Sequence, residues 1–127
     1  MRIYLKYLSI IFLSLFVAQN TLAETFHFYR PYKNAYSLTK ASININGVKK
    51  VVASEAYVNF SVNGAYTIVV DGHGIFGAQM KKSKVRGTAS GSGNKYFLVS
   101  VRENIISKFV ITETSKQNFD FARGQSN

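Results

Sequence analysis

Ala-Tyr-Val-Asn-Phe-Ser-Val-Asn-Gly-Ala-Tyr-Thr-Ile-Val-Val-Asp, from Ala56 to Asp71, is the stretch that decides the fold class. Its first half alternates the apolar residues Val58, Phe60 and Val62 with more polar neighbours, which is the period of a half-buried strand. Asn63-Gly64 follows, and this pair is a strong hairpin signal because both residues tolerate positive φ. The second half is rich in β-branched side chains, which suit a pleated sheet. The stretch therefore predicts a hairpin of antiparallel β structure.

The register of this predicted hairpin has two solutions. A two-residue loop would place the apolar face of the first strand beside Ala65, Thr67 and Val69. One extra residue in the loop would place it beside Tyr66, Ile68 and Val70, which form a more apolar set. A slip of one residue moves the whole side-chain set to the other face of a sheet. We therefore favour a three-residue loop or an adjacent bulge, with the two-residue turn as the second choice.

Short segments of the same kind occur along the rest of the chain. The predicted strands are Thr25 to Arg30, Lys40 to Asn46, Val48 to Ala53, Met80 to Arg86, Lys95 to Arg102 and Ile105 to Glu113, and Phe119 and Phe121 are candidates for an additional short strand. Seven or eight short strands separated by frequent turn signals predict an all-β fold, an antiparallel β-sandwich.

Individual segments add detail to this fold. Asn46-Gly47 predicts a two-residue turn, which leaves Lys50 on an apolar face, where it must lie at an end or extend its amine to solvent. Lys95 to Arg102 is apolar on both faces and predicts a central strand. Phe26 and Phe28 alternate on one face of the first strand. The residues expected in the core include Phe60, Ile68, Leu98, Val99 and Phe109.

Residues 1–23 predict a helical, cleaved secretory signal peptide. Arg2 and Lys6 form a positive start, Leu8 to Ala18 is mostly apolar, and Ala23 is a small residue at the cleavage position. The apolar run is shorter than the roughly 20 residues that cross a bilayer, so no membrane span is expected after cleavage. The predicted organisation is a signal peptide at 1–23, one domain at 24–122 and a flexible tail at 123–127. This predicts a periplasmic or secreted protein, without disulfides because the sequence has no Cys.

The charge of the chain predicts an anionic partner or simply a soluble surface. Beyond residue 23, 14 Lys and Arg face six Asp and Glu, and such an excess favours polyanionic surroundings. The candidate anion-binding residues lie within fifteen positions that contain no acid, and they are Lys81, Lys82, Lys84, Arg86 and Lys95. On a strand, alternate residues share a face about 6.5–7 Å apart, so three of them could contact a polymer together. The competing interpretation is that these side chains protect an edge strand from pairing with another molecule.

Catalytic and metal-binding patterns are weak in this sequence. His27 alternates with two Phe and is expected to point outward from its strand. Asp71 and His73 could share a face at a strand end, but a metal needs further ligands, and the glycines beside His73 favour a turn. Ser90 to Gly93 lacks the Gly-Lys-Ser/Thr ending of a phosphate-binding loop. We expect no enzyme, no cofactor and no metal.

Four motifs in order resemble a family of small exported bacterial proteins that is catalogued as a domain of unknown function. They are Phe26 to Pro31, which contains Tyr-Arg-Pro, then Ile45 to Lys50, Tyr57 to Val62, and Gly93 to Val101. The resemblance covers roughly residues 26–112. It implies a transthyretin-like or surface-layer accessory β-sandwich, and no catalytic residue carries over. The chain departs from the family in lacking a lipoprotein cysteine and in having Asn63 to Tyr66 where relatives have Pro-Gly-x-His.

Two functions follow from these observations. The first is a non-catalytic protein of the bacterial envelope, acting as a small binding or structural accessory module. The alternative is a polyanion-binding protein that uses the basic strand and the loop after it on lipopolysaccharide, a cell-wall polymer or DNA. The expected partner is thus an anionic envelope polymer or another envelope protein, and no small-molecule substrate is expected.

Overall fold

The computed structural model describes residues 23–33, 36–73, 80–103 and 107–125, and it is mostly β. The signal peptide predicted at 1–23 lies outside this part of the chain except for Ala23. Eight strands form two four-stranded sheets, and one α-helix, α2 (Lys116–Gln125), lies in the described part of the chain. Both the number of strands and the all-β class agree with the sequence prediction.

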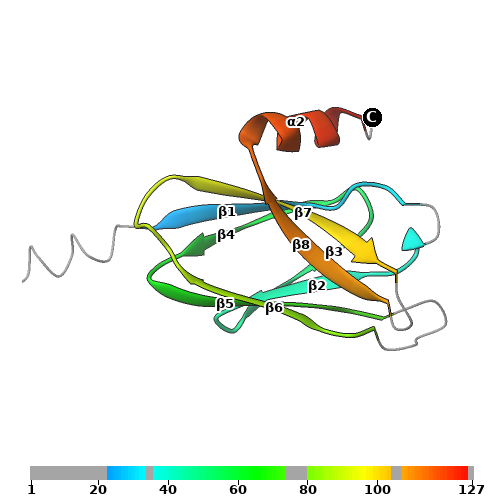
Figure 1. The fold of residues 1–127 in the computed structure, drawn as a ribbon, viewed down its shortest axis with the longest axis horizontal. Helices are drawn as coiled ribbons and strands as arrows, with labels where there is room; N and C mark the ends of the chain where they lie inside the picture. The colour runs from blue at the N-terminus through cyan, green and yellow to red at the C-terminus, as the bar shows by residue number, and fades with distance from the viewer. Residues whose placement is uncertain (1–22, 34–35, 74–79, 104–106, 126–127) are drawn as a thin grey trace, which may run out of the picture.

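The two sheets lie face to face (Figure 1). One, which we call the covered sheet because α2 lies on its outer side, has the strand order β4 (Tyr57–Val62), β1 (Glu24–Tyr29), β7 (Asn94–Arg102) and β8 (Lys108–Thr114). The other, which we call the open sheet, has the order β3 (Val48–Val52), β2 (Ala41–Ile45), β5 (Ala65–Gly72) and β6 (Ser83–Thr88). No helix of the described residues is long and apolar enough to cross a bilayer.

The core lies between the sheets and receives alternate residues from both. Phe28 of the covered sheet stacks on Phe97 at 4.8 Å between ring centroids and meets Phe60 edge-on at 5.6 Å. Ile43 and Ile68 of the open sheet are fully buried in the same cluster. Large apolar side chains of this kind supply most of the stability of a small domain. The predicted inward faces of β1, β2 and β5 are therefore confirmed.

Leu98 is an exception among the predicted core residues. Its neighbours Phe97 and Val99 are buried between the sheets, so alternation places Leu98 on the outer face of the covered sheet. There it is half-buried. The prediction of a central strand is correct, since β7 lies between β1 and β8.

The hairpin predicted at Asn63-Gly64 is wrong. β4 pairs with β1 in the covered sheet, whereas β5 pairs with β2 and β6 in the open sheet. The chain therefore passes from one sheet to the other at this point. Val62 and Tyr66 both face the core because each strand turns its apolar side toward the space between the sheets. This crossing between the sheets accounts for the apolar pattern on both sides of the turn. The three-residue loop and the bulge that we favoured from the sequence do not occur there.

Asn46-Gly47 behaves as predicted. Both residues have positive φ, 51° and 91°, and Ile45 pairs with Val48 across a two-residue turn. Two successive positive φ values are the signature of the type I′ turn that suits hairpin twist. Lys50 lies on the inward side of β3 but extends its amine out, where Nζ donates to the Asn59 carbonyl at 2.5 Å.

One strand pair departs from the antiparallel prediction. β1 and β7 run parallel, with Thr25 opposite Asn94 and Tyr29 opposite Leu98. The covered sheet is therefore mixed, while the open sheet is antiparallel throughout its named strands. A parallel pair needs a long connection, and here the whole open sheet lies between β1 and β7 in the sequence.

The C-terminal segment is a helix, and the strand predicted at Phe119 and Phe121 is wrong. Ser115 precedes the helix and its hydroxyl accepts a hydrogen bond from the Asn118 amide at 3.1 Å, which is an N-cap. A strand would place Phe119 and Phe121 on one face, but the helix turns them apart, so they are 1% and 65% exposed. The helix continues through Gln125 and so includes the first residues of the segment predicted to be a tail.

Candidate anion-binding face

The outer face of the open sheet is exposed to solvent and polar. Its central row crosses all four strands, from Lys49 of β3 through Asn44 and Val69 to Lys84 of β6. Because neighbouring strands are about 4.8 Å apart, this row is roughly 14 Å long. Arg86 lies in the next row, opposite Thr67. The central row is therefore basic at both edge strands, and its two inner positions, Asn44 and Val69, are uncharged.

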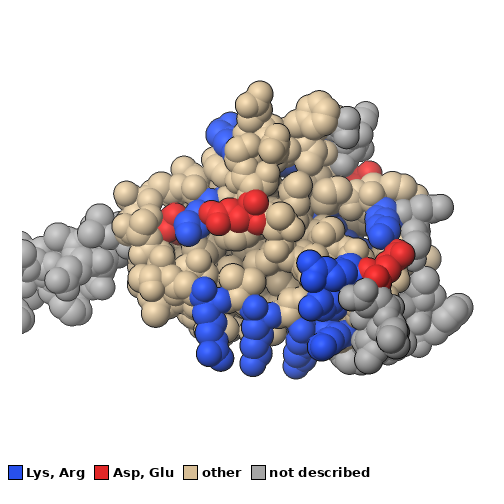
Figure 2. Space-filling view, viewed as in Figure 1, with Lys and Arg blue, Asp and Glu red and all other residues tan. Residues whose placement is uncertain are grey.

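Three of the five predicted anion-binding residues are on this face. Lys82 precedes β6, and Lys84 and Arg86 alternate along it with exposed side chains. Figure 2 shows a row of Lys and Arg side chains projecting from the lower edge of the molecule, where Figure 1 places β6. β6 is an edge strand, as predicted. Lys84 and Arg86 therefore share one face, while binding by these residues stays a prediction.

The other two predicted residues lie elsewhere. Lys81 forms an isolated bridge with Lys108, and its amide donates to the Ser107 carbonyl, so it belongs to the seam between β6 and β8. Lys95 is on β7 of the covered sheet, where its amine lies 5.8 Å from the centre of the Phe26 ring. Proximity in the sequence grouped them with β6, but the fold separates them from the open face.

Lys49 is the main residue that sequence reasoning missed. It is exposed on β3, at the edge of the open sheet opposite β6. The two-residue turn at Asn46-Gly47 determines which face of the sheet Lys49 occupies, because the resulting register places Lys49 on the face opposite to Ile43 and Ile45. The pattern of one hairpin does not reveal which remote strand completes the sheet, so the relation between Lys49 and Lys84 was not predictable.

Two adjoining hollows of about 230 and 300 Å³ occupy this face and share Ser42, Lys49 and Asp71 among their lining residues. Asp71 is the one acidic side chain among the described residues of the face. Its side chain is 26% exposed, one carboxylate oxygen is 4.0 Å from Lys82 Nζ, and the other accepts the Gly72 amide at 2.8 Å. The hollow therefore combines cations at its border with hydrogen-bonding groups at its floor.

His73 and Asp71 both line one of these hollows, so the structure brings the two side chains to the same place. A metal ion needs at least three suitable ligands in reach. No three His, Cys, Asp or Glu side chains gather in this way within the described ranges. The arrangement can hold an anion and donate or accept hydrogen bonds, and it offers no metal centre in that part of the chain.

The outer face of the covered sheet is different, and His27 lies at its centre. The ring points outward, as predicted, and stacks on Tyr96 at 4.8 Å. Its Nδ1 lies 2.5 Å from the Tyr57 hydroxyl, and its Nε2 lies 2.8 Å from Asn94 Oδ1. Phe119 of α2 packs over this group. His27 therefore has both nitrogens occupied and belongs to the contact that holds the helix.

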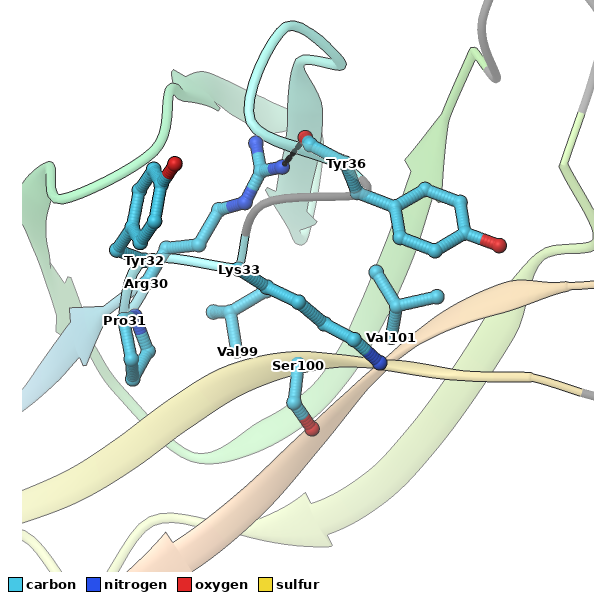
Figure 3. Close-up of a pocket in the computed structure, with 8 residues that line it drawn as sticks. All are labelled: Arg30, Pro31, Tyr32, Lys33, Tyr36, Val99, Ser100 and Val101. Carbon is cyan, nitrogen blue, oxygen red and sulfur yellow. Dashed lines mark hydrogen bonds between the residues drawn. The ribbon is translucent and has the colours of Figure 1, made fainter.

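A further pocket of about 180 Å³ lies beside the connection from β1 to β2 (Figure 3). Arg30 lines it and is 3% exposed, and burial lowers the pKa of its guanidinium. The guanidinium donates to the carbonyls of Tyr36, Thr39 and Val52 and lies 4.7 Å from the centre of the Phe109 ring. These contacts fasten the connection to β3, so Arg30 is a structural residue.

Comparison with known proteins gives no match to any family description, curated protein or solved structure. The resemblance to the exported bacterial family therefore stays a prediction, and the outer faces of the two sheets are the features that bear on function.

Proposed function

We propose that this protein is an exported, non-catalytic binding module of the bacterial envelope that holds an anionic polymer on the outer face of its open sheet. In this proposal the two sheets form a β-sandwich that serves as a rigid scaffold. Export is supported by the sequence of residues 1–23, which has the layout of a signal peptide. The expected ligand carries repeated phosphate or carboxylate groups.

One observation supports the proposal above the others. Lys49, Lys84 and Arg86 are exposed on one face whose described residues include a single acid, Asp71. Cations held at fixed positions of a sheet can contact several charges of a polymer at once, with little loss of backbone freedom on binding. Each basic residue near an anionic surface contributes roughly 1 kcal/mol, so several together give measurable affinity.

Protection of an edge strand is the competing role for the same side chains. It accounts for Lys82, Lys84 and Arg86 on the exposed edge β6. It requires no contribution from the floor residue Ser42, which lies on β2, two strands from that edge. The two roles also differ in solution, because loss of edge protection causes self-association while loss of a binding site weakens ligand affinity.

The test compares a variant with Lys82→Gln, Lys84→Gln and Arg86→Gln with the wild type. Binding to lipopolysaccharide, duplex DNA and phosphatidylglycerol vesicles is measured by fluorescence anisotropy or sedimentation over a range of salt concentrations. Loss of three contacts of roughly 1 kcal/mol each predicts a fall in affinity on the order of 100-fold. Wild-type binding should weaken steeply with added salt, because multiple ionic contacts release counterions.

A matched control removes three exposed charges away from this face, with Lys33→Gln, Arg102→Gln and Lys116→Gln. It has the same net charge as the first variant and should bind within about threefold of the wild type if position matters more than total charge. Equal losses in both triple variants, or no binding by the wild type at low salt, would contradict the proposal. Self-association of the first variant with unchanged affinity would support edge protection instead.

A further inference from the structure

The floor of the hollow differs from a simple phosphate-binding surface. Ser42 and Asp71 lie opposite each other on β2 and β5, and both line the two adjoining hollows. A hydroxyl can donate or accept a hydrogen bond, whereas a carboxylate only accepts. Asp71 would repel a phosphate but would accept hydrogen bonds from hydroxyl groups of a ligand. The floor therefore suits a ligand that carries hydroxyl groups as well as negative charge.

The same face has few groups that stack on nucleic acid bases. Proteins bind single strands by stacking bases on aromatic side chains, in addition to contacting phosphates. Among the described residues of this face the one aromatic ring is the imidazole of His73, which lines one hollow, since Tyr66 of β5 points into the core. The apolar residues of the floor are Val51 and Val69, which offer small, flat contacts.

Two lysines lie on opposite sides of this floor. Lys49 lines the side formed by β3, and Lys82 lines the opposite side, beyond β5. Lys82 is 62% exposed in its side chain and can reach a ligand while remaining near Asp71. Negative groups of a ligand would meet these cations, while its hydroxyl groups would meet Ser42 and Asp71.

From this arrangement we propose that the ligand of the open face is an anionic polysaccharide, in which acidic groups alternate with hydroxyl-bearing sugar rings. This inference rests on the proposed function, because it names the chemical class of polymer for the same face. Lys49, Lys82 and Lys84 provide the charge contacts, and Ser42 and Asp71 discriminate sugar hydroxyls from bare phosphate.

The experiment compares four probes at fixed salt: oligogalacturonate, inorganic polyphosphate of matched charge, single-stranded DNA and phosphatidylglycerol vesicles. Oligogalacturonate carries carboxylates and hydroxyls, whereas polyphosphate carries charge alone along its chain. Wild-type protein should bind oligogalacturonate about tenfold more tightly than polyphosphate, the factor expected for one or two hydrogen bonds that involve a charged group.

Asp71→Asn and Ser42→Ala, each tested alone, should reduce this ratio to about twofold or less. Asp71→Asn should also raise polyphosphate affinity, because it removes a negative charge from the floor. Thr88→Ala, at the far end of β6 on the same face, is the matched control and should leave the ratio unchanged.

The outcomes separate the two proposals. If the wild type binds none of the four probes, the proposed function fails. If it binds polyphosphate and oligogalacturonate equally, and loses both in the Lys82, Lys84 and Arg86 variant, the basic face is a polyanion site but the polysaccharide inference is overturned. Tightest binding to single-stranded DNA or to vesicles would overturn it as well.

Discussion

The outer faces of the two sheets are built from similar strands but have opposite surroundings. On the covered sheet the outward residues include His27, Tyr57 and Tyr96, and Phe119 of α2 packs against all three. On the open sheet the corresponding outward residues are polar or charged, such as Ser42 and Lys84. The difference shows that alternation determines which side chains point outward, while their chemistry determines whether the face is covered or exposed to solvent.

Apolar area explains this difference. Rings that face outward from a sheet leave a large apolar surface in water, and burying them is favourable by about 25 cal/mol per Å². The helix α2 supplies this burial through one ring, Phe119, and Arg123 adds a cation–π contact at 4.4 Å from the centre of the Tyr57 ring. The open sheet has little to gain from a cover, because its lysines are better hydrated.

The largest expected effect is on the covered face. Phe119→Ala should lower the free energy of unfolding by about 3 kcal/mol, near the lower end for a buried Phe, because α2 can separate while the sheets remain folded. Val69→Ala on the open face is the matched change and should cost less than about 1 kcal/mol, since this residue is partly exposed. Urea denaturation followed by circular dichroism measures both. Equal losses would remove the distinction between the faces.

Arg30 allows a test of how the two sheets are joined. Arg30→Met should cost about 2 kcal/mol, because it removes the guanidinium donor from the carbonyls of Tyr36, Thr39 and Val52, of which Tyr36 keeps the Thr39 amide as a second donor. Arg30→Lys should recover only part of this loss, since an ammonium lacks the planar fork that reaches several acceptors. Thermal unfolding of the two variants gives the comparison, and a Met variant as stable as the wild type would show that the connection holds without this residue.

The N-cap of α2 should have a smaller effect on stability. Ser115→Ala should cost about 1 kcal/mol, because the Asn118 amide loses its N-cap acceptor. Hydrogen exchange should show the loss in the first turn of α2, with the amides of the open sheet unchanged. Uniform loss of protection through both sheets would mean that α2 is needed for the whole fold.

Sequence reasoning succeeded where local pattern was sufficient and failed where remote pairing decided. Asn46-Gly47 and Asn63-Gly64 are the same dipeptide, yet the first closes a hairpin and the second leads from one sheet to the other. A turn signal records a change of direction and gives no information about the partner strand. Inward faces were predictable because both sheets enclose one core, so alternation has the same meaning in each.

The candidate site was predictable only in part for the same reason. Lys84 and Arg86 share a face by strand geometry alone, which the sequence shows. Lys49 and Ser42 lie on the same face as these residues because β3, β2, β5 and β6 pair in this order. The local sequence pattern of each strand does not predict this order. At the C-terminus, two Phe residues two positions apart predicted a strand. The segment is a helix instead, because Ser115 caps its first turn and Phe119 alone packs on the outward rings of the covered sheet.

In our proposal the open face binds the ligand, while the covered face holds the helix. An NMR titration of the ¹⁵N-labelled protein with oligogalacturonate, with backbone amide shifts followed residue by residue, tests this division between the two faces. Shift changes are expected at Ser42, Lys49, Asp71 and Lys84, with little change along α2. Shift changes confined to α2 and its neighbours on β1 and β4 would contradict it.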